Sequence, residues 1–257
     1  MHPFLITLSP AKKFHSIDMA DLTAATSPLF IEMADALADS LKRMSISDLQ
    51  KIMDISTSIA ELNHQRYQTY HPHQVSHGYP AAALFAGDAY KTLDYSTFTP
   101  TQRRTSQDCL FILSGLYGLL RPQDMIQPYR LEMGSRVKSF LGHDLYAYWR
   151  STLTAWLNQH IEQHAFQMHI DLASVEYGKA LDYDRLSIPT IRIVFADEQG
   201  SQYRVVGIKA KRARGLMARF VITHSCQSMD DIRQFKQGYA YSEIHSDNTQ
   251  MVFLSTD

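Results

Sequence analysis

Cysteine and long apolar runs are both scarce in this sequence. Among its 257 residues the only cysteines are Cys109 and Cys226, and neither belongs to a CxxC pair. Two such isolated cysteines are typical of reduced thiols, which argues against a disulfide-rich secreted domain and predicts an intracellular protein. No stretch approaches the roughly 20 apolar residues that cross a bilayer. We therefore expect no membrane partner.

Net charge and metal-binding motifs are also lacking. The formal net charge is −1, so any nucleic-acid binding requires local clusters of basic residues. The 12 histidines form no HExxH motif, and we predict neither a metal site nor a cofactor. The N-terminal apolar run, Phe4 to Leu8, is too short for a signal peptide and follows no basic region. We expect a cytoplasmic monomer.

The fold class follows from length and from the order of the elements. A chain of 257 residues with 45% hydrophobic content can bury a large core. Strand-like and helix-like segments alternate along it, which predicts an α/β (α+β mixed) protein. We expect residues 1–257 to form a single compact domain with a mixed central sheet and flanking helices.

Apolar periodicity and turn residues mark the individual elements. The predicted strands are 4–8, 81–85, 109–113, 167–172, 191–196, 203–208 and 251–254. The predicted helices are 28–43, two short helices within 45–70, 99–107, 144–163, one that starts at 175, and 209–223. Ser27, Ser47 and Ser174 are the expected N-caps of three of them, and residues 197–201 the expected loop of a hairpin.

The stretch from Cys109 to Gly134 is the centre of this organisation. Its apolar start, Cys109 to Leu113, predicts a central strand that is covered on both faces. Glycines and a proline-stiffened polar loop follow, and such loops at strand ends often bind ligands in α/β proteins. The alternative is a β-turn followed by a solvated loop. The candidate site residues here are Ser114, Tyr117, Arg121, Tyr129, Arg130 and Glu132.

Polar residues recur just beyond three other predicted strands. They are Ser9 and Lys12, Asp88 and Tyr90, and Ser174 and Glu176. If these strand ends converge, Glu132 or Glu176 would be an acid or base, Asp88 an orienting group, and Arg121 or Arg130 an anion clamp. Tyr117 or Tyr129 could stack on a base. Alternatively, Ser9 and Lys12 lie in a solvated turn, and Ser174 and Glu176 only start a helix.

A basic helix carries the clearest electrostatic signal. No Asp or Glu occurs from Gln199 to Met229. At 3.6 residues per turn, Lys211, Arg214 and Arg212 can share an exposed face, while Arg219 lies nearer the apolar side. These residues could neutralise DNA phosphates. The alternative is a solvated face paired with acids elsewhere. The candidate DNA-binding residues are Lys209, Lys211, Arg212 and Arg214.

Residues 45–70 carry a second candidate for DNA contact. Two short helices with a break at Asp54-Ile55-Ser56 could form a helix-hairpin-helix, which presents backbone amides to phosphate. The glycines that are usual in that hairpin are missing here, so an ordinary helical pair is the alternative.

Taken together, these segments resemble the bacterial YaaA family of peroxide-stress proteins over nearly the whole chain. The resemblance rests on LSPAK (8–12), IMDIS (52–56), LNHQRY (62–67), FAGDAY (85–90), LSGLYGLLRPQDMIQPYRLEMG (113–134), GHDLYAYW (142–149), DLASVEY (171–177) and KRARGLMARF (211–220). It implies a response to hydrogen peroxide that limits damage linked to intracellular iron. It also implies DNA binding through a helix-hairpin-helix at the positions of residues 45–70. Asp171 stands where the family usually has Asn, and Arg212 where it usually has Lys.

Three functions follow as hypotheses. The first is a peroxide-stress protein that binds double-stranded or partly opened DNA with little sequence specificity. The second is an enzyme that acts on a nucleotide, a nucleobase or damaged nucleic acid in a polar cleft, where a small anionic ligand would bind. The third is direct iron binding, for which no compact set of ligands is visible.

Overall fold

Ten strands can be named in the described part of the computed structural model, which covers residues 2–15, 26–71, 78–200 and 202–256. They are β1 (Phe4–Leu8), β2 (Tyr79–Pro80), β3 (Leu110–Ser114), β4 (Gly118–Leu120), β5 (Met125–Ile126), β6 (Met168–Leu172), β7 (Thr190–Gln199), β8 (Gln202–Arg204), β9 (Tyr239–Ser242) and β10 (Gln250–Ser255). The main sheet follows the order β4-β3-β1-β6-β7-β10-β9, and β8 pairs with β7. Strands β3, β1, β6, β7 and β10 are parallel, whereas β4, β8 and β9 are antiparallel to their neighbours. The sheet is therefore mixed, as predicted.

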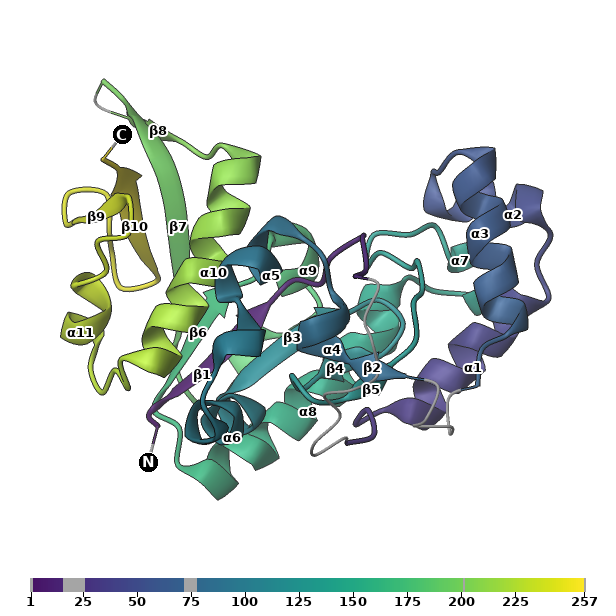
Figure 1. Cartoon of the computed structure of the whole chain (residues 1–257), viewed down its shortest axis with the longest axis horizontal. Coiled ribbons are helices and arrows are strands. Elements are labelled where there is room, and N and C mark those ends of the chain that lie inside the picture. The colour runs from purple at the N-terminus through teal and green to yellow at the C-terminus, as the bar shows by residue number, and fades with distance from the viewer. Residues whose placement is uncertain (1, 16–25, 72–77, 201, 257) are drawn as a thin grey trace.

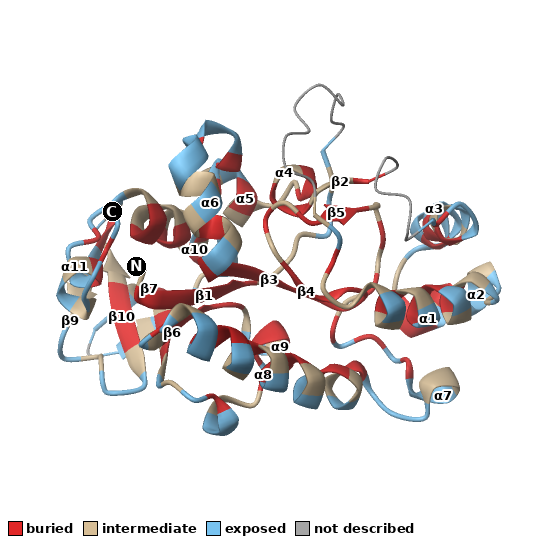
Figure 2. Cartoon of the chain, turned by 90° about the horizontal axis from the view of Figure 1, so that it is seen from below, coloured by how far each residue is buried: buried red, intermediate tan, exposed pale blue. Residues whose placement is uncertain are grey.

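Helices cover both faces of this sheet (Figures 1 and 2). Those of the described residues are α1 (Ile31–Lys42), α2 (Ile46–Met53), α3 (Thr57–Gln68), α4 (Ala81–Leu84), α5 (Asp88–Leu93), α6 (Pro100–Cys109), α7 (Lys138–Leu141), α8 (Leu145–His164), α9 (Val175–Gly178), α10 (Gly207–Thr223) and α11 (Met229–Arg233). Figure 2 shows α5, α6 and α10 on one face and α8 and α9 on the other. Helices α1, α2, α3 and α7 lie beyond the β4 edge. The chain forms one compact α/β domain.

Strand β3 lies inside the sheet, between β4 and β1, and all of its residues are buried. Burial on both faces is what its unbroken apolar sequence requires. The prediction of a covered, non-edge strand is confirmed, although β6 is nearer the middle of the sheet. Cys109 is the last residue of α6 rather than the first of the strand. A capping box at Thr99 starts this helix, which continues to the strand without a loop, so that Leu110 is both its C-cap and the first strand residue.

The two glycines after β3 serve packing inside the protein. A Cβ on Gly115 would lie 2.2 Å from the Leu131 carbonyl oxygen. Gly118 has a φ of +71°, and a Cβ there would lie 2.7 Å from the Trp149 ring. These positions let the chain after β3 fold back closely, and that contact fixes where the loop from residue 127 to residue 137 runs.

Three sequence-based predictions of local structure are wrong. Residues 81–84 form helix α4 rather than a strand, because the Ala-rich run follows Pro80 at the N-cap and alanine favours helix. Strand β7 runs to Gln199 and pairs with a β8 that ends at Arg204, so the hairpin is tighter than predicted. Helix α10 already begins at Gly207.

The caps of two helices also differ from prediction. Ser45, not Ser47, caps α2, through a capping box with Asp48. Helix α1 begins at Ile31 after Phe30, so Ser27 is not its cap. In contrast, Ser174 caps α9 as expected, by accepting a hydrogen bond from the Tyr177 backbone N–H.

The α2–α3 pair turns as the sequence predicted. Asp54 ends α2 in the left-handed conformation, with a φ of 51°, which Asp tolerates better than most residues. The Tyr67 hydroxyl donates to the Arg130 carbonyl (2.9 Å), and the Arg136 N–H donates to the Ile52 carbonyl (2.9 Å). The pair is thereby fixed to the loop that follows β5.

Buried polar side chains lie on the sheet strands. His169 of β6 is fully buried, with its ring nitrogens 2.9 Å from Thr7 Oγ1 and 3.0 Å from Thr190 Oγ1. Burial lowers the pKa of His169 from 6.5 to about 4, so the ring is neutral at pH 7. Buried Asp171 accepts hydrogen bonds from Arg192 (3.1 Å) and Tyr183 (2.9 Å).

None of the described helices combines the length and apolar character that crossing a bilayer would need. A cytoplasmic location stays a prediction. The sequence around His73 and His77 is polar and rich in turn residues, which predicts a loop, and both histidines lie outside the described residues.

Candidate functional site

A recess opens where β1 and β6 end. Ser9 follows β1 and Ser174 lies just beyond β6, and the Ser174 backbone N–H donates to Ser9 Oγ at 2.8 Å. From β1 the sheet extends to β3 on one side and to β6, β7 and β10 on the other. Open α/β sheets bind ligands outside the carboxyl ends of their strands at this kind of reversal in strand order. The position of the recess is therefore set by the topology of the sheet.

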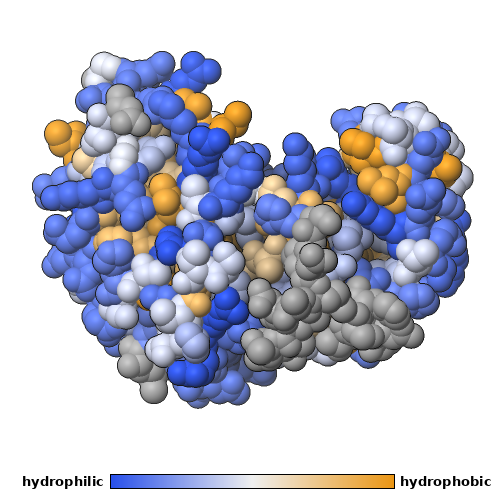
Figure 3. Space-filling view, in the orientation of Figure 1, coloured by the Kyte–Doolittle hydropathy of each residue, from blue (hydrophilic) through white to orange (hydrophobic). Residues whose placement is uncertain are grey.

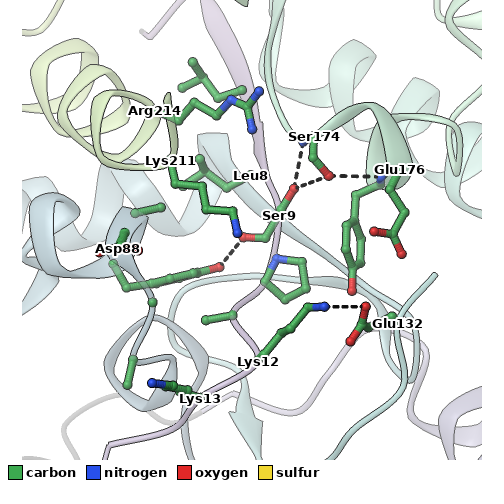
Figure 4. Close-up of a pocket in the computed structure, with 18 of the residues that line it drawn as sticks. Leu8, Ser9, Lys12, Lys13, Asp88, Glu132, Ser174, Glu176, Lys211 and Arg214 are labelled. Carbon is green, nitrogen blue, oxygen red and sulfur yellow. Dashed lines mark hydrogen bonds and ion pairs between the residues drawn. The ribbon is translucent and has the colours of Figure 1, made fainter. Parts of the chain in front are cut away.

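The recess encloses about 490 Å³ and gathers most of the polar residues singled out in the sequence. A volume in the range of about 300–1,000 Å³ is usual for small-molecule sites. Figure 4 shows side chains from β1, α5, α9, α10 and the loop after β5 around it. Nine of the twelve cleft candidates line it: Ser9, Lys12, Asp88, Tyr90, Tyr129, Arg130, Glu132, Ser174 and Glu176.

The other three candidates lie elsewhere. Ser114 is buried behind the recess, where its hydroxyl is 2.7 Å from the Tyr129 hydroxyl. Tyr117 is buried beside it, and its ring packs edge-on against Tyr129. Arg121 forms an ion pair with buried Asp124 (2.8 Å). Ser114 and Tyr117 thus support the wall of the recess, and Arg121 is not placed to clamp an anion there.

The carboxylates of the recess all have partners. Glu132 lies between two cations, with Lys12 Nζ at 2.7 Å and Arg130 Nη2 at 2.6 Å. Glu176 accepts a hydrogen bond from the Gly134 backbone N–H at 3.0 Å. Asp88 lies 3.5 Å from the guanidinium of Arg212. These contacts hold the carboxylates in place. Glu132 is the middle member of a row of three charged side chains, Lys12, Glu132 and Arg130.

Three buried tyrosines form part of the lining. Tyr90 donates its hydroxyl hydrogen to the Ser9 carbonyl (2.8 Å) and so positions the turn after β1. Burial raises the pKa of Tyr90, Tyr129 and Tyr177 above the ordinary value of 10.0. They stay neutral at physiological pH and act as hydroxyl groups, not as phenolate bases.

Positive charge dominates the recess. Its lining holds six basic side chains and three acidic ones, Asp88, Glu132 and Glu176, which gives a formal charge of +3 in a chain whose net charge is −1. The basic residues are Lys12, Lys13, Lys91, Arg130, Lys211 and Arg214. Sequence analysis missed Lys13, Lys91 and Tyr177, although Lys13 directly follows Lys12 and Tyr177 follows Glu176.

The basic residues of α10 separate into two groups. Lys209 pairs with Asp197 (3.0 Å), Arg212 faces Asp88, and Arg219 donates to Thr97 Oγ1 (2.8 Å). Lys211 and Arg214 extend instead toward Ser9 and Ser174 (Figure 4). Arg214 does not lie on an open face, as the sequence suggested, but is half-buried.

Arg214 lines the recess, and one of its hydrogen-bond donors has no acceptor within the described part of the chain. Its Nε is buried and has no hydrogen-bond partner among the described residues. Burial lowers the pKa of this guanidinium, although arginine stays charged in proteins. A buried donor without a partner costs free energy. A ligand with a hydrogen-bond acceptor in the recess would provide the missing partner for this Nε.

The surface around the recess is concave on a larger scale. Figure 3 shows a saddle between the part that contains α10 and the part that contains α2 and α3. Apolar side chains are exposed on both sides of it, including Ile59 and Leu62 on α3 and Ile208 on α10. The recess is lined by α10 on one side and by the loop after β5 on the other, and that loop contacts α3 through the Tyr67–Arg130 hydrogen bond.

Thiol chemistry with peroxide has no suitable residue here. Cys109 and Cys226 are both buried and free. Burial raises the pKa of both thiols, that of Cys226 to about 11. Reactive cysteines have exposed thiols with lowered pKa values. Among the described residues, no three His, Cys, Asp or Glu side chains form a group that could hold a metal ion.

Comparison with known proteins identifies similar chains over nearly the full length. The family model for the peroxide stress protein YaaA matches residues 4–245. A UPF0246 protein of Legionella pneumophila (strain Paris) is 39% identical over 249 residues, which cover 95% of this chain and 98% of that protein. A UPF0246 protein of Burkholderia cenocepacia is 38% identical over 253 residues, with 97% of each chain covered. A third, from Cereibacter sphaeroides, is 40% identical over 256 residues, with 98% and 99% covered.

Proposed function

Because the chain belongs to the peroxide stress protein YaaA family, we propose that it serves the peroxide stress response by binding DNA. In this proposal the protein acts as a cytoplasmic monomer and binds DNA with little sequence specificity. It thereby limits the damage that iron and peroxide together cause to DNA. No residue of the chain is assigned to iron.

This proposal rests on the cationic recess and on its rim, by which we mean the exposed residues Lys13 and Lys211 at its opening. Phosphate neutralisation by Lys and Arg supplies most of non-specific DNA binding, and it needs local charge rather than net charge. A formal charge of +3 over the recess lining provides that local charge. Lys13 and Lys211 are exposed at the recess, and neither forms an ion pair with another described residue. They are therefore free to contact phosphates.

The α2–α3 pair is the proposed second contact, across the saddle. The N-cap of α3 is Ser56, whose side chain makes no capping hydrogen bond to the helix. The first-turn amides of a helix of this length can bind a phosphate oxygen. Asp54 in the turn opposes an anion, however, and replaces the flexible glycine of the usual hairpin. We therefore assign α2–α3 a smaller share of the binding than the recess.

A salt series on duplex DNA tests the proposal. Each lost phosphate contact lowers the slope of log affinity against log salt by about 0.9. The Lys13→Ala, Lys211→Ala double variant should therefore lose about two units of slope, and it should lose affinity equally for duplexes of unrelated sequence. Fluorescence anisotropy at several salt concentrations measures both effects.

The control is Lys236→Ala, which removes an exposed lysine outside the recess. It should leave the slope unchanged. A double variant with a native circular dichroism spectrum and an unchanged slope would remove the recess from the DNA surface. Survival of peroxide by cells that lack a family member, complemented with each variant, connects binding to the response.

One observation favours a second function, chemistry on a nucleotide, a nucleobase or damaged nucleic acid. Glu132 and Glu176 line the same recess as Ser9, and a carboxylate beside a bound substrate can exchange protons with it. Incubation of the protein with nucleotides and with oxidised DNA, followed by mass spectrometry of the products, tests this. Product formation that Glu176→Gln abolishes would establish an enzyme, and the absence of product with every substrate would leave binding alone.

A further inference from the structure

The recess is built for a smaller unit than a DNA duplex. Its volume of about 490 Å³ lies within the range of about 300–1,000 Å³ that is usual for small-molecule sites. A duplex can contact the rim but cannot enter, whereas a single nucleotide can. The carboxyl-end position between β1 and β6 is the one at which open α/β sheets bind such ligands.

One end of the recess is suited to a phosphate group. Lys211 and Arg214 lie one helical turn apart on α10 and point toward the two serines that follow β1 and β6 (Figure 4). The buried Nε of Arg214 has no hydrogen-bond partner among the described residues. Guanidinium groups bind phosphate oxygens through paired, charge-assisted hydrogen bonds. The Ser174 hydroxyl accepts a hydrogen bond from Ser9 Oγ at 3.2 Å and keeps its own hydrogen, so it adds a neutral donor beside them.

The other end is suited to a base. In Figure 4, Lys12 and Glu132 lie on the side of Ser9 away from Arg214. The Lys12–Glu132–Arg130 chain presents charged donors and a carboxylate acceptor, which match the polar edge of a base. Pro10, Ala11 and Leu131 contribute apolar surface to the lining, against which a flat ring can lie.

From this arrangement we infer that the recess binds one nucleoside phosphate, with its phosphate on Lys211 and Arg214 and its base beside Lys12 and Glu132. The unit is either a free nucleotide or an unpaired nucleotide at an end or opening of DNA. The inference deepens the proposed DNA binding, because it names the part of the nucleic acid that enters the protein. It does not require that a duplex binds at the rim.

Calorimetric titration of the full-length protein with dAMP, adenosine and inorganic phosphate is the first test. We expect dAMP to bind about ten- to a hundredfold more tightly than adenosine, because charge-assisted contacts to the phosphate are lost with the nucleoside. Inorganic phosphate should also bind more weakly than dAMP. Equal binding of dAMP and inorganic phosphate would overturn the base site, and no binding of dAMP would overturn the inference altogether.

Two variants locate the phosphate. Arg214→Gln and Lys211→Ala should each weaken dAMP about tenfold or more and leave the affinity for adenosine unchanged. Lys211 is exposed, so its removal should not disturb folding even where Arg214→Gln does. The control is Lys209→Ala on the same helix, whose side chain pairs with Asp197 outside the recess. Full affinity for dAMP in folded Lys211→Ala and Arg214→Gln proteins would overturn the assignment.

Competition experiments identify the source of the nucleotide and separate this inference from duplex binding. Displacement of dAMP by a duplex with one unpaired adenosine, but not by a fully paired duplex of equal length, would assign the site to DNA. No displacement by either would assign it to the free nucleotide. A protein that binds duplex DNA with the expected salt slope but takes no dAMP overturns the nucleotide site alone. A protein that binds dAMP through Arg214 without that slope overturns only the duplex proposal.

Discussion

The recess and the α2–α3 pair are the two regions that sequence reasoning linked to DNA, and they differ in how they would bind it. The recess gathers long cationic side chains from α10 and from the loops after β1 and β5. The α2–α3 pair offers backbone amides at one turn, beside the carboxylate of Asp54. Positive charge concentrates in the first region, whereas the turn of the second carries the negative charge of Asp54.

This difference shows that a run of basic residues is not by itself a binding surface. Helix α10 carries five basic residues, yet contacts from outside the helix occupy Lys209, Arg212 and Arg219. Only Lys211 and Arg214 are directed at the recess. Binding therefore depends on which basic side chains already have a partner within the folded protein and which do not.

The largest effect should come from separating α10 from α5. A Cβ on Gly215 would lie 1.9 Å from the Ala89 carbonyl oxygen, so Gly215→Ala must push the two helices apart. We expect the free energy of unfolding to fall by more than about 3 kcal/mol, and binding to the recess to be lost while α2 and α3 stay helical. Denaturant unfolding and dAMP titration measure the two effects.

A matched glycine provides the control. A Cβ on Gly207, at the start of α10, would meet nothing within 4 Å. Gly207→Ala should therefore be nearly neutral for stability and binding. Equal losses of stability and binding in both variants would show that any alanine in α10 is harmful. The close contact between α10 and α5 would then not be the cause of the loss in Gly215→Ala.

Acid should weaken the sheet below the recess through His169. Its pKa is about 4 in the folded protein against an ordinary 6.5, so the unfolded chain binds a proton first as pH falls. The stability that neutral His169 contributes is complete above pH 6.5 and is lost between about pH 6.5 and 4, by about 3 kcal/mol. Urea unfolding across this range measures it.

His169→Gln removes the titrating group and provides the comparison. The variant should be less stable at pH 7, because the hydrogen bonds to Thr7 and Thr190 change. Between about pH 6.5 and 4, the variant should lose about 3 kcal/mol less free energy of unfolding than the unaltered protein. Parallel pH profiles of the two proteins would exclude His169 as the cause.

Single lysine substitutions compare the two regions directly. Lys211→Ala in the recess should lower the salt slope of duplex binding by about 1. Lys51→Ala, an exposed lysine in α2, should lower it by less than half of that. Anisotropy titrations at matched salt concentrations measure both, and equal slopes for the two variants would make α2–α3 an equal partner in DNA binding.

The smallest effect should come from the turn at Asp54. Asp54→Asn keeps a residue that tolerates the left-handed conformation but removes the negative charge near the start of α3. If a phosphate binds there, affinity for duplex DNA should rise about twofold, as expected for one exposed charge near a helix end. The same anisotropy assay detects the change, and an unaltered affinity would place the turn outside the interface.

Local sequence signals determined most of the elements. The apolar runs of β1 and β3, the capping box at Thr99 and the N-caps at Asp144 and Ser174 involve neighbours in the chain, so they can be predicted without a fold. The sequence also named twelve cleft candidates, and nine of them line the recess. They could be named because polar residues that follow parallel strands meet at one edge of the sheet.

Tertiary structure alone decided which of these groups have partners. Arg212 meets Asp88, and Glu132 is held by Lys12, across more than a hundred residues of sequence. Arg121, which chain position placed near the site, pairs locally with Asp124, and the fold also brings its guanidinium to the Ser27 carbonyl (2.9 Å), away from the recess. Pairing and burial depend on distances through space, so sequence could name the charged residues of this protein, and only the folded sheet and helices selected those that face the recess.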